Sequence, residues 1–177
     1  IFFTSRTHIM KVYVLQGKHD VGKSLTLATL FTKYAANMKI ISSYEDDDVA
    51  AIKKQIADKY QAIRNGAECA SPYVLSVVEY NGIRIGLHTS GDDKETAETS
   101  IKLFNGEISG NIPCDIGFCA ARTKGITVKT LKDFEAQGNE VIFVKQPVAL
   151  QGGDFETSNT EQAEYLLTLL NGFLGIK

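Results

Sequence analysis

The sequence contains few cysteines, and their positions exclude two common kinds of site. The three cysteines, Cys69, Cys114 and Cys119, form neither a CxxC pair nor a cysteine–histidine cluster with metal-ligand spacing. A small, odd number of scattered cysteines is also unlike a disulfide framework. We therefore expect a reduced, cytoplasmic protein.

Long apolar runs and dense positive charge are absent as well. No stretch approaches the ~18 apolar residues that a membrane-spanning helix needs, and the first ten residues lack the continuous apolar segment of a signal peptide. The formal net charge is -2, and lysine and arginine form no dense run. These absences argue against a membrane protein, a secreted protein and a protein whose main partner is nucleic acid.

The amino-acid composition is typical of one globular domain. The chain has 177 residues, of which 44% are hydrophobic and 23% charged, and this length can bury one sizeable core. Residues 1–9 precede Met10, a candidate native start, and we interpret them as a leader outside the fold. Residues 10–177 are then expected to form a single domain.

Strand and helix patterns alternate along the chain and predict the fold class. Two β-rich runs joined by Asn81-Gly82 predict an antiparallel hairpin. We expect a three-layer α/β/α sandwich with a mainly parallel sheet of about five strands and one antiparallel hairpin strand. A loop is expected over 146–159. The strand patterns cover 11–16, 39–42, 72–80, 83–89, 115–120 and 140–145, and the helical patterns cover 23–37, 49–63 after the acidic residues 45–48, 95–104, 127–137 and 161–173.

The segment Gly17–Ser24, GKHDVGKS, matches the pattern G-x-x-x-x-G-K-[ST] at every fixed position. Gly17 and Gly22 let the backbone turn tightly, so that successive amide groups point at phosphate oxygens near the positive end of a helix. Lys23 would reach the β- and γ-phosphates, and the Ser24 hydroxyl would coordinate magnesium. The segment lies between a predicted strand and a predicted helix, which is the context that this motif requires.

On this motif, the chain resembles the P-loop nucleoside triphosphatase superfamily. The resemblance implies Mg²⁺ bound together with a nucleoside triphosphate. It does not specify the reaction. The residues that we expect to contact the nucleotide are Gly17, Lys18, His19, Asp20, Val21, Gly22, Lys23, Ser24 and Leu25, with Gly91 and Arg122 from later segments.

A second part of the site is expected after the strand Ile83–Leu87. Small GTPases have a similar hairpin-fed strand that ends in D-x-x-G, and this chain offers His88-Thr89-Ser90-Gly91 instead. A neutral imidazole is a poor substitute for a carboxylate beside magnesium, so we expect His88 to be structural or exposed, like His19. Asp92 is our candidate for a water-mediated magnesium contact or for orienting the attacking water. The alternative is that Asp92 caps the next helix. Gly91 would present its amide to the γ-phosphate.

The loop Arg122–Gly125 follows a core strand at the edge of the sheet where ligands bind in open α/β folds. It lacks the aspartate of the N-K-x-D pattern that small GTPases use for guanine, which favours ATP over GTP. Arg122 would stack on adenine or offer positive charge to the γ-phosphate, or else be an ordinary surface arginine. Gln146–Val148 reaches the same edge and is expected to pack beside the base.

These expectations favour a small switch-type ATPase that uses Lys23, Asp92 and Arg122 in magnesium-dependent hydrolysis. A phosphotransferase is the first alternative, although Arg64, Arg84 and Arg122 are the only arginines after residue 9, and such enzymes usually clamp their second substrate with several. The second is a non-hydrolysing nucleotide-binding module of a larger assembly. Two kinds of partner are also left open. One is a second copy of the chain, in a homodimer similar to that of ParA partition proteins, for which Lys18 is suitably placed. The other is a separate protein.

Overall fold

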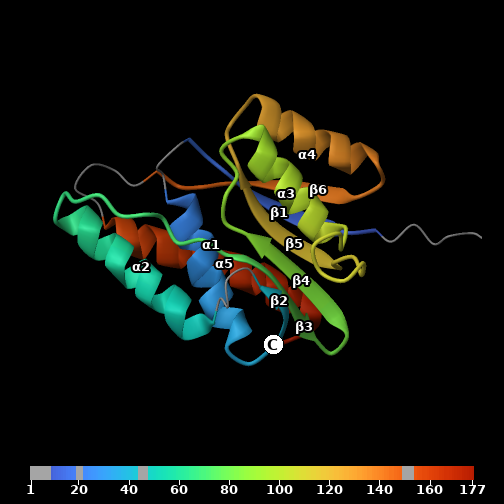
Figure 1. The fold of residues 1–177 in the computed structure, drawn as a ribbon, viewed down its shortest axis with the longest axis horizontal. Helices are drawn as coiled ribbons and strands as arrows, with labels where there is room; N and C mark the ends of the chain where they lie inside the picture. Colours follow the sequence, from blue (N-terminus) through green and yellow to red (C-terminus); the bar gives the residue numbers. More distant parts are fainter. Residues whose placement is uncertain (1–8, 19–21, 44–47, 149–153) are drawn as a thin grey trace, which may run out of the picture.

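The computed structural model describes residues 9–18, 22–43, 48–148 and 154–177, which form a sheet covered by helices on both faces (Figure 1). None of the helices in these ranges is both long and apolar enough to cross a membrane. The strands are β1 (Lys11–Gln16), β2 (Lys39–Ser43), β3 (Leu75–Tyr80), β4 (Ile83–His88), β5 (Ile116–Ala121) and β6 (Glu140–Lys145). The helices are α1 (Lys23–Ala35), α2 (Val49–Arg64), α3 (Lys94–Phe104), α4 (Ile126–Ala136) and α5 (Phe155–Leu174).

The six described strands have the order β2-β3-β4-β5-β1-β6. β3 pairs antiparallel with both β2 and β4, and the other pairs are parallel. The predicted fold class is therefore confirmed, with six strands where about five were expected. The order also places β5 between β1 and β4, which the sequence pattern did not predict.

The hairpin between β3 and β4 forms where the sequence predicts it. Asn81 and Gly82 both have positive φ angles, 48° and 81°, as a type I′ turn requires at its two central residues. The turn sets a continuous register from Tyr80 opposite Ile83 to Leu75 opposite His88. This register determines which face of the sheet each side chain of β4 occupies.

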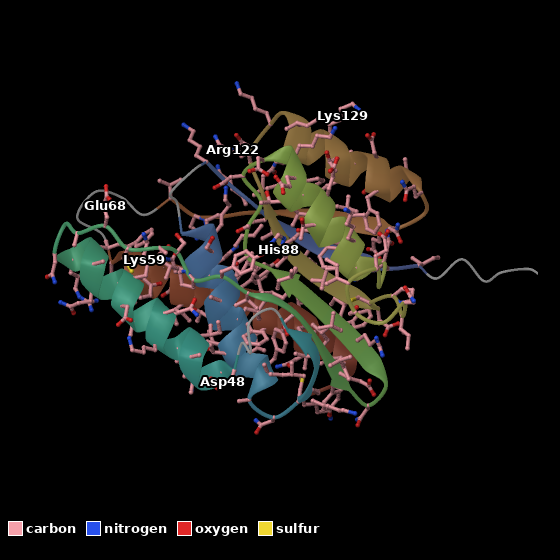
Figure 2. The ribbon with its side chains drawn as sticks, viewed as in Figure 1. Asp48, Lys59, Glu68, His88, Arg122 and Lys129 are labelled. Carbon is pink, nitrogen blue, oxygen red and sulfur yellow. The ribbon has the colours of Figure 1, made fainter. Side chains whose placement is uncertain are left out.

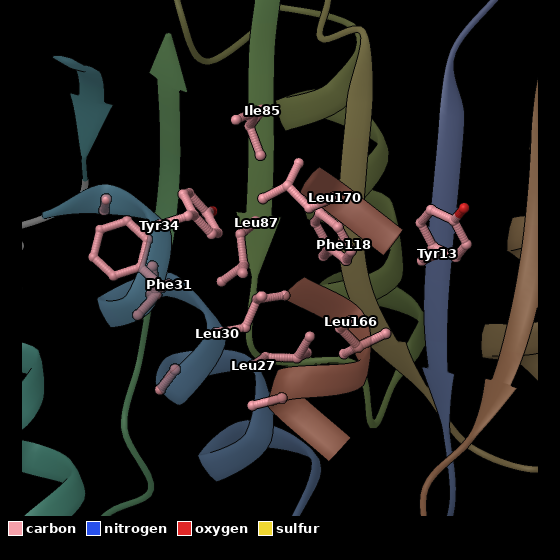
Figure 3. Packing of buried hydrophobic residues seen from close by; sticks show 14 of the residues in the cluster. Tyr13, Leu27, Leu30, Phe31, Tyr34, Ile85, Leu87, Phe118, Leu166 and Leu170 are labelled. Atoms are coloured by element: carbon pink, nitrogen blue, oxygen red, sulfur yellow. The ribbon is translucent and has the colours of Figure 1, made fainter. Parts of the chain in front are cut away.

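Two separate hydrophobic cores lie on the two faces of the sheet. The helices α1, α2 and α5 cover one face, and α3 and α4 cover the other. Burial of these side chains is the main source of stability, since each large apolar side chain contributes roughly 1.5–3 kcal/mol. Figure 3 shows the first core, with Leu27, Leu30, Phe31 and Tyr34 of α1 facing Tyr13, Ile85, Leu87 and Phe118 of the sheet and Leu166 and Leu170 of α5.

Two glycines let α3 approach the sheet closely. Gly86 and Gly117 are paired in register on β4 and β5, and the ring of Phe104, at the end of α3, lies over both. A Cβ at Gly117 would be 2.6 Å from Cε1 of Phe104, and one at Gly86 would be 3.0 Å from its Cδ1. A side chain at Gly117 would therefore have to move Phe104, and one at Gly86 would press on both Phe104 and Cys114.

The last helix begins earlier than the sequence pattern indicates. We expected a loop over 146–159, but α5 starts at Phe155, and the Asp154 carboxylate accepts a hydrogen bond of 3.0 Å from the Thr157 amide. Polar residues occupy most of this first turn, so its helical pattern is weak. The difference matters because the start of α5 supplies Phe155 to a cleft and Asn159 to the contact with Gly22.

Replacing Gly117 with alanine should lower the free energy of unfolding by about 1–3 kcal/mol, because the added methyl group overlaps the Phe104 ring. Shortening Phe104 to leucine in the same chain should recover part of this loss, so the two substitutions should not be additive. Urea unfolding of the wild type, both single variants and the double variant measures the coupling. Additive losses would show that Phe104 does not limit the space above Gly117.

Candidate functional site

The carboxyl ends of three strands bring together loops that are distant in the sequence. Gly17–Gly22 follows β1, Thr89–Asp93 follows β4 and Arg122–Gly125 follows β5. α1 leaves β1 over one face of the sheet, whereas α4 leaves the neighbouring β5 over the opposite face. Such a divergence is a topological switch point, where open α/β sheets bind their ligands.

Gly22 occupies a position that only glycine fits. Its φ angle is 90°, in the left-handed region, and the Thr26 amide donates to its carbonyl at 2.9 Å to begin α1. A Cβ at this position would lie 2.5 Å from Oδ1 of Asn159. Both the backbone conformation and the adjacent α5 therefore require glycine here.

The helices that begin at the switch point differ from the other three in how they are capped. α2, α3 and α5 begin with aspartates, Asp48, Asp93 and Asp154, whose side chains accept main-chain hydrogen bonds. α1 and α4 begin with Gly22 and Gly125, have no side-chain cap and have no acidic residue in the first turn. Their amide groups and positive dipole ends favour an anion at the switch point.

Lys23 lies at the mouth of the glycine-rich loop. Its Nζ donates to the carbonyl oxygens of Gly17 at 2.6 Å and Lys18 at 3.1 Å, and it is 3.3 Å from Oδ1 of Asp92. The side chain is only 6% exposed, whereas Asp92 is 43% exposed. A buried ammonium group is thus held in one place beside a carboxylate that solvent reaches.

Asp92 also contacts Arg122. The Arg122 Nε donates to the main-chain oxygen of Asp92 at 3.1 Å and lies 3.9 Å from its carboxylate oxygen Oδ1. Asp93, not Asp92, caps α3, with its carboxylate accepting from the Thr96 amide at 2.8 Å. The alternative that Asp92 is the helix cap is therefore wrong. The structure instead brings together the three predicted catalytic residues Lys23, Asp92 and Arg122.

Ser24 and Gly91 lie in the same region. The Ser24 hydroxyl donates to the Thr89 carbonyl at 3.2 Å, which ties the start of α1 to the end of β4. Gly91 is buried against β5, where a Cβ would be 1.8 Å from the Ala120 carbonyl oxygen. The main chain at Gly91 therefore approaches β5 more closely than any other residue type would permit.

His88 has a structural environment, as expected. Its ring nitrogens contact the Tyr73 hydroxyl at 3.2 Å and the Ser100 hydroxyl of α3 at 2.7 Å. Burial lowers its pKa from 6.5 to about 4. Because side chains alternate along β4, His88 lies on the α3 side of the sheet, while Leu87 belongs to the core beneath α1. His88 is therefore not positioned to replace a carboxylate beside Ser24.

A cleft of about 1100 Å³ opens beside these groups. The first turn of α1 and the loop after β4 form its charged end. Its other walls come from α2, the segment 67–71 and the first residue of α5, which include Lys59, Ile63 and Phe155. Figure 2 shows Lys59 and Glu68 on the α2 side of the molecule and Arg122 near the start of α3. The cleft thus extends well beyond the glycine-rich loop.

A buried polar network supports the loop from behind. The Gln146 amide group donates to the Thr26 hydroxyl at 3.1 Å and to Oδ1 of Asn159 at 2.9 Å, and the Asn159 amide group donates to the Tyr60 hydroxyl at 3.1 Å. The Gln146 side chain was expected beside the base but is buried under α1, only 1% exposed. The network joins the end of β6 with α1, α2 and α5, directly behind Gly22.

Some of the other residues that were predicted to contact the nucleotide lie within the described residues and some do not. Leu25 is buried and lines the cleft, and Lys18 is exposed with its carbonyl turned to Lys23. His19, Asp20 and Val21 lie outside the described residues. Sequence reasoning missed four residues around the cleft and the loop. Lys59 and Tyr60 have no local signal beyond a place in a helical pattern, and Phe155 and Asn159 fall in the segment 146–159 that was expected to be a loop.

His88 should make the stability of the protein depend on pH. Its folded pKa of about 4 lies below the unfolded value of 6.5, so the unfolded chain binds more protons in this window and stability falls as the pH falls from about 7 toward 4. Between pH 7 and pH 5 the wild type should lose about 2 kcal/mol more than His88→Gln. Urea unfolding at both pH values measures this, and equal losses in the two proteins would contradict the assignment.

Comparisons of the chain with protein families, with curated proteins and with solved structures found no significant match. The function must therefore be argued from the residues themselves. Within the described ranges, no group of three histidine, cysteine, aspartate or glutamate side chains is arranged to hold a metal ion. What these ranges do contain is an uncapped helix start with a buried lysine, a neighbouring carboxylate and an adjoining cleft.

Proposed function

We propose that this chain binds a nucleoside triphosphate with magnesium, ATP in preference to GTP, and hydrolyses it as a small switch-type ATPase. The observation that carries the proposal is the position of Lys23. It is buried at the start of an uncapped helix, held by the carbonyls of its own loop, and adjacent to Asp92. The G-x-x-x-x-G-K-[ST] pattern assigns the lysine at this position to phosphate binding.

Binding would rest on charge and preorganisation. The α1 amide groups and the Lys23 ammonium group offer positive charge at one point. Because two carbonyls already hold Lys23 in place, little side-chain entropy would be lost when a phosphate oxygen becomes its partner. The phosphate would compete with Asp92 for Lys23, so that binding would affect the loop after β4.

The oxygen donors near the loop fit magnesium. Ser24 supplies a hydroxyl group and Asp92 a carboxylate to the same cleft. Magnesium in nucleotide sites is usually held by one or two protein oxygens together with phosphate oxygens and water, rather than by a cage of protein ligands. When bound, the metal would neutralise charge on the β- and γ-phosphates.

Hydrolysis would use the groups around Asp92. The oxygen of a water molecule would bond to the γ-phosphorus, the bond from that phosphorus to the bridging oxygen would break, and a proton of the water would pass to the phosphate product as ADP leaves. Asp92 would orient the water or the water shell of the metal, and the Gly91 amide would contact the γ-phosphate. Arg122, 46% exposed at this end of the site, would stabilise the charge that develops on the γ-phosphoryl group. The preference for ATP rests on the sequence: the loop Arg122–Gly125 lacks the aspartate that small GTPases use for guanine, so the chain lacks that means of selecting GTP wherever the base lies.

Lys23→Ala should abolish binding of MgATP as measured by isothermal titration calorimetry, because it removes the buried ammonium group from the loop. Lys33→Ala is the matched control, since Lys33 lies on the same helix and its side chain pairs with Glu164 on the surface. The control should bind MgATP like the wild type, and MgGTP should bind more weakly than MgATP. If the wild type binds neither nucleotide, the proposal is wrong.

Asp92→Asn should slow phosphate release from MgATP by about 10- to 100-fold, the usual effect of losing a residue that orients a metal's water or a reactant. Its affinity for MgATP should stay the same or increase, because the substitution also removes the carboxylate that competes with phosphate for Lys23. Asp93→Asn is the control, because asparagine also caps helices well and Asp93 faces Thr96. Steady-state phosphate release and calorimetry on both variants separate turnover from binding. Similar rates in all three proteins would remove Asp92 from the chemistry.

A further inference from the structure

The cleft beside the glycine-rich loop has two chemically different ends. Lys23, Ser24 and Asp92 line one end. The other end is mixed: Ile63 and Phe155 offer apolar surface there, next to the charged residues Lys59 and Glu68. The volume of about 1100 Å³ exceeds the roughly 300–1,000 Å³ of typical small-molecule sites. There is consequently room for an organic group next to a triphosphate, and Ile63 and Phe155 offer apolar surface for a ring.

Phe155 offers the aromatic surface at this end. It is the first residue of α5, it is half-buried, and its ring packs edge-to-face on Tyr60 with the ring centroids 6.3 Å apart and an interplanar angle of 76°. The part of Phe155 that lines the cleft remains available for contact with a ligand. Aromatic side chains can stack on any nucleobase, because every base has a flat π face.

The position of Phe155 is linked to that of the glycine-rich loop. Tyr60, on which it packs, accepts a hydrogen bond of 3.1 Å from Asn159. Asn159 in turn lies against Gly22, where it leaves no space for a Cβ. The aromatic wall and the proposed phosphate site are therefore held together by buried contacts, as preorganised binding requires.

We propose that the nucleobase of the bound nucleotide stacks on Phe155, at the α2–α5 end of the cleft. This inference rests on the proposed function and adds the residue that recognises the base. It replaces the expectation that the base lies beside Arg122–Gly125 and Gln146–Val148. Gln146 is turned inward to Thr26 and Asn159, and Arg122 contacts Asp92 at the charged end, so neither provides a surface for a ring.

The test compares MgATP with magnesium tripolyphosphate, which has the phosphates but no base. Phe155→Ala should weaken MgATP binding by about tenfold, which corresponds to about 1.4 kcal/mol, and should change tripolyphosphate binding less than about twofold. Phe155→Tyr should bind MgATP like the wild type, whereas Phe155→Leu, which keeps an apolar side chain, should behave like Phe155→Ala. Calorimetry gives the affinities, and thermal unfolding confirms that each variant is folded.

Phe173→Ala is the matched control, because Phe173 is a partly exposed phenylalanine at the far end of the same helix. It should bind both ligands like the wild type. If Phe155→Ala leaves MgATP binding unchanged, or weakens both ligands equally, the base does not stack on Phe155. If the wild type binds neither ligand, the proposed function itself fails. A third outcome is that Lys23→Ala loses tripolyphosphate binding while Phe155→Ala binds MgATP like the wild type. That outcome would overturn only the base site.

Discussion

The packing of Gly22 against Asn159 is the constraint on which the site depends. The left-handed backbone at Gly22 turns the chain from β1 into α1, and Asn159 occupies the space where a side chain would be. Asn159 is itself bonded to Gln146 and Tyr60. Four elements, β6, α1, α2 and α5, thus meet behind one glycine. Because breaking a buried polar network is costly, this arrangement keeps the start of α1 in a fixed position relative to the cleft.

On the cleft side of Gly22, the charged groups are arranged around the Asp92 carboxylate. Lys23 and Arg122 both contact Asp92, and α1 and α4, which follow the neighbouring strands β1 and β5, both begin without a side-chain cap. A phosphate bound there would compete with the Asp92 carboxylate for both cations. Asp92 precedes the cap of α3, so the competition would extend to the start of that helix. Such a link between a bound phosphate and a neighbouring loop is what a switch requires.

The sequence predicts features that local chemistry determines. The Asn81-Gly82 hairpin and the strand–loop–helix unit around Gly17–Ser24 follow from turn residues and periodicity, and the structure contains both. The position of β5 between β1 and β4 depends on contacts distant in sequence, so no local pattern reveals it. Asp93, rather than Asp92, caps α3 because Thr96 lies three residues further on and completes a capping box, a signal that could have been used. Asn159 and Phe155 could not be assigned to the site without the tertiary structure, because their roles come from Gly22 and Tyr60.

A cocrystal structure with magnesium and a non-hydrolysable ATP analogue tests the central claim most directly. The account predicts the β- and γ-phosphates within the loop Gly17–Ser24, with the Lys23 ammonium group bonded to phosphate oxygens and the Asp92 carboxylate displaced from it. A nucleotide bound elsewhere on the molecule, with Lys23 still paired to Asp92, would contradict the account.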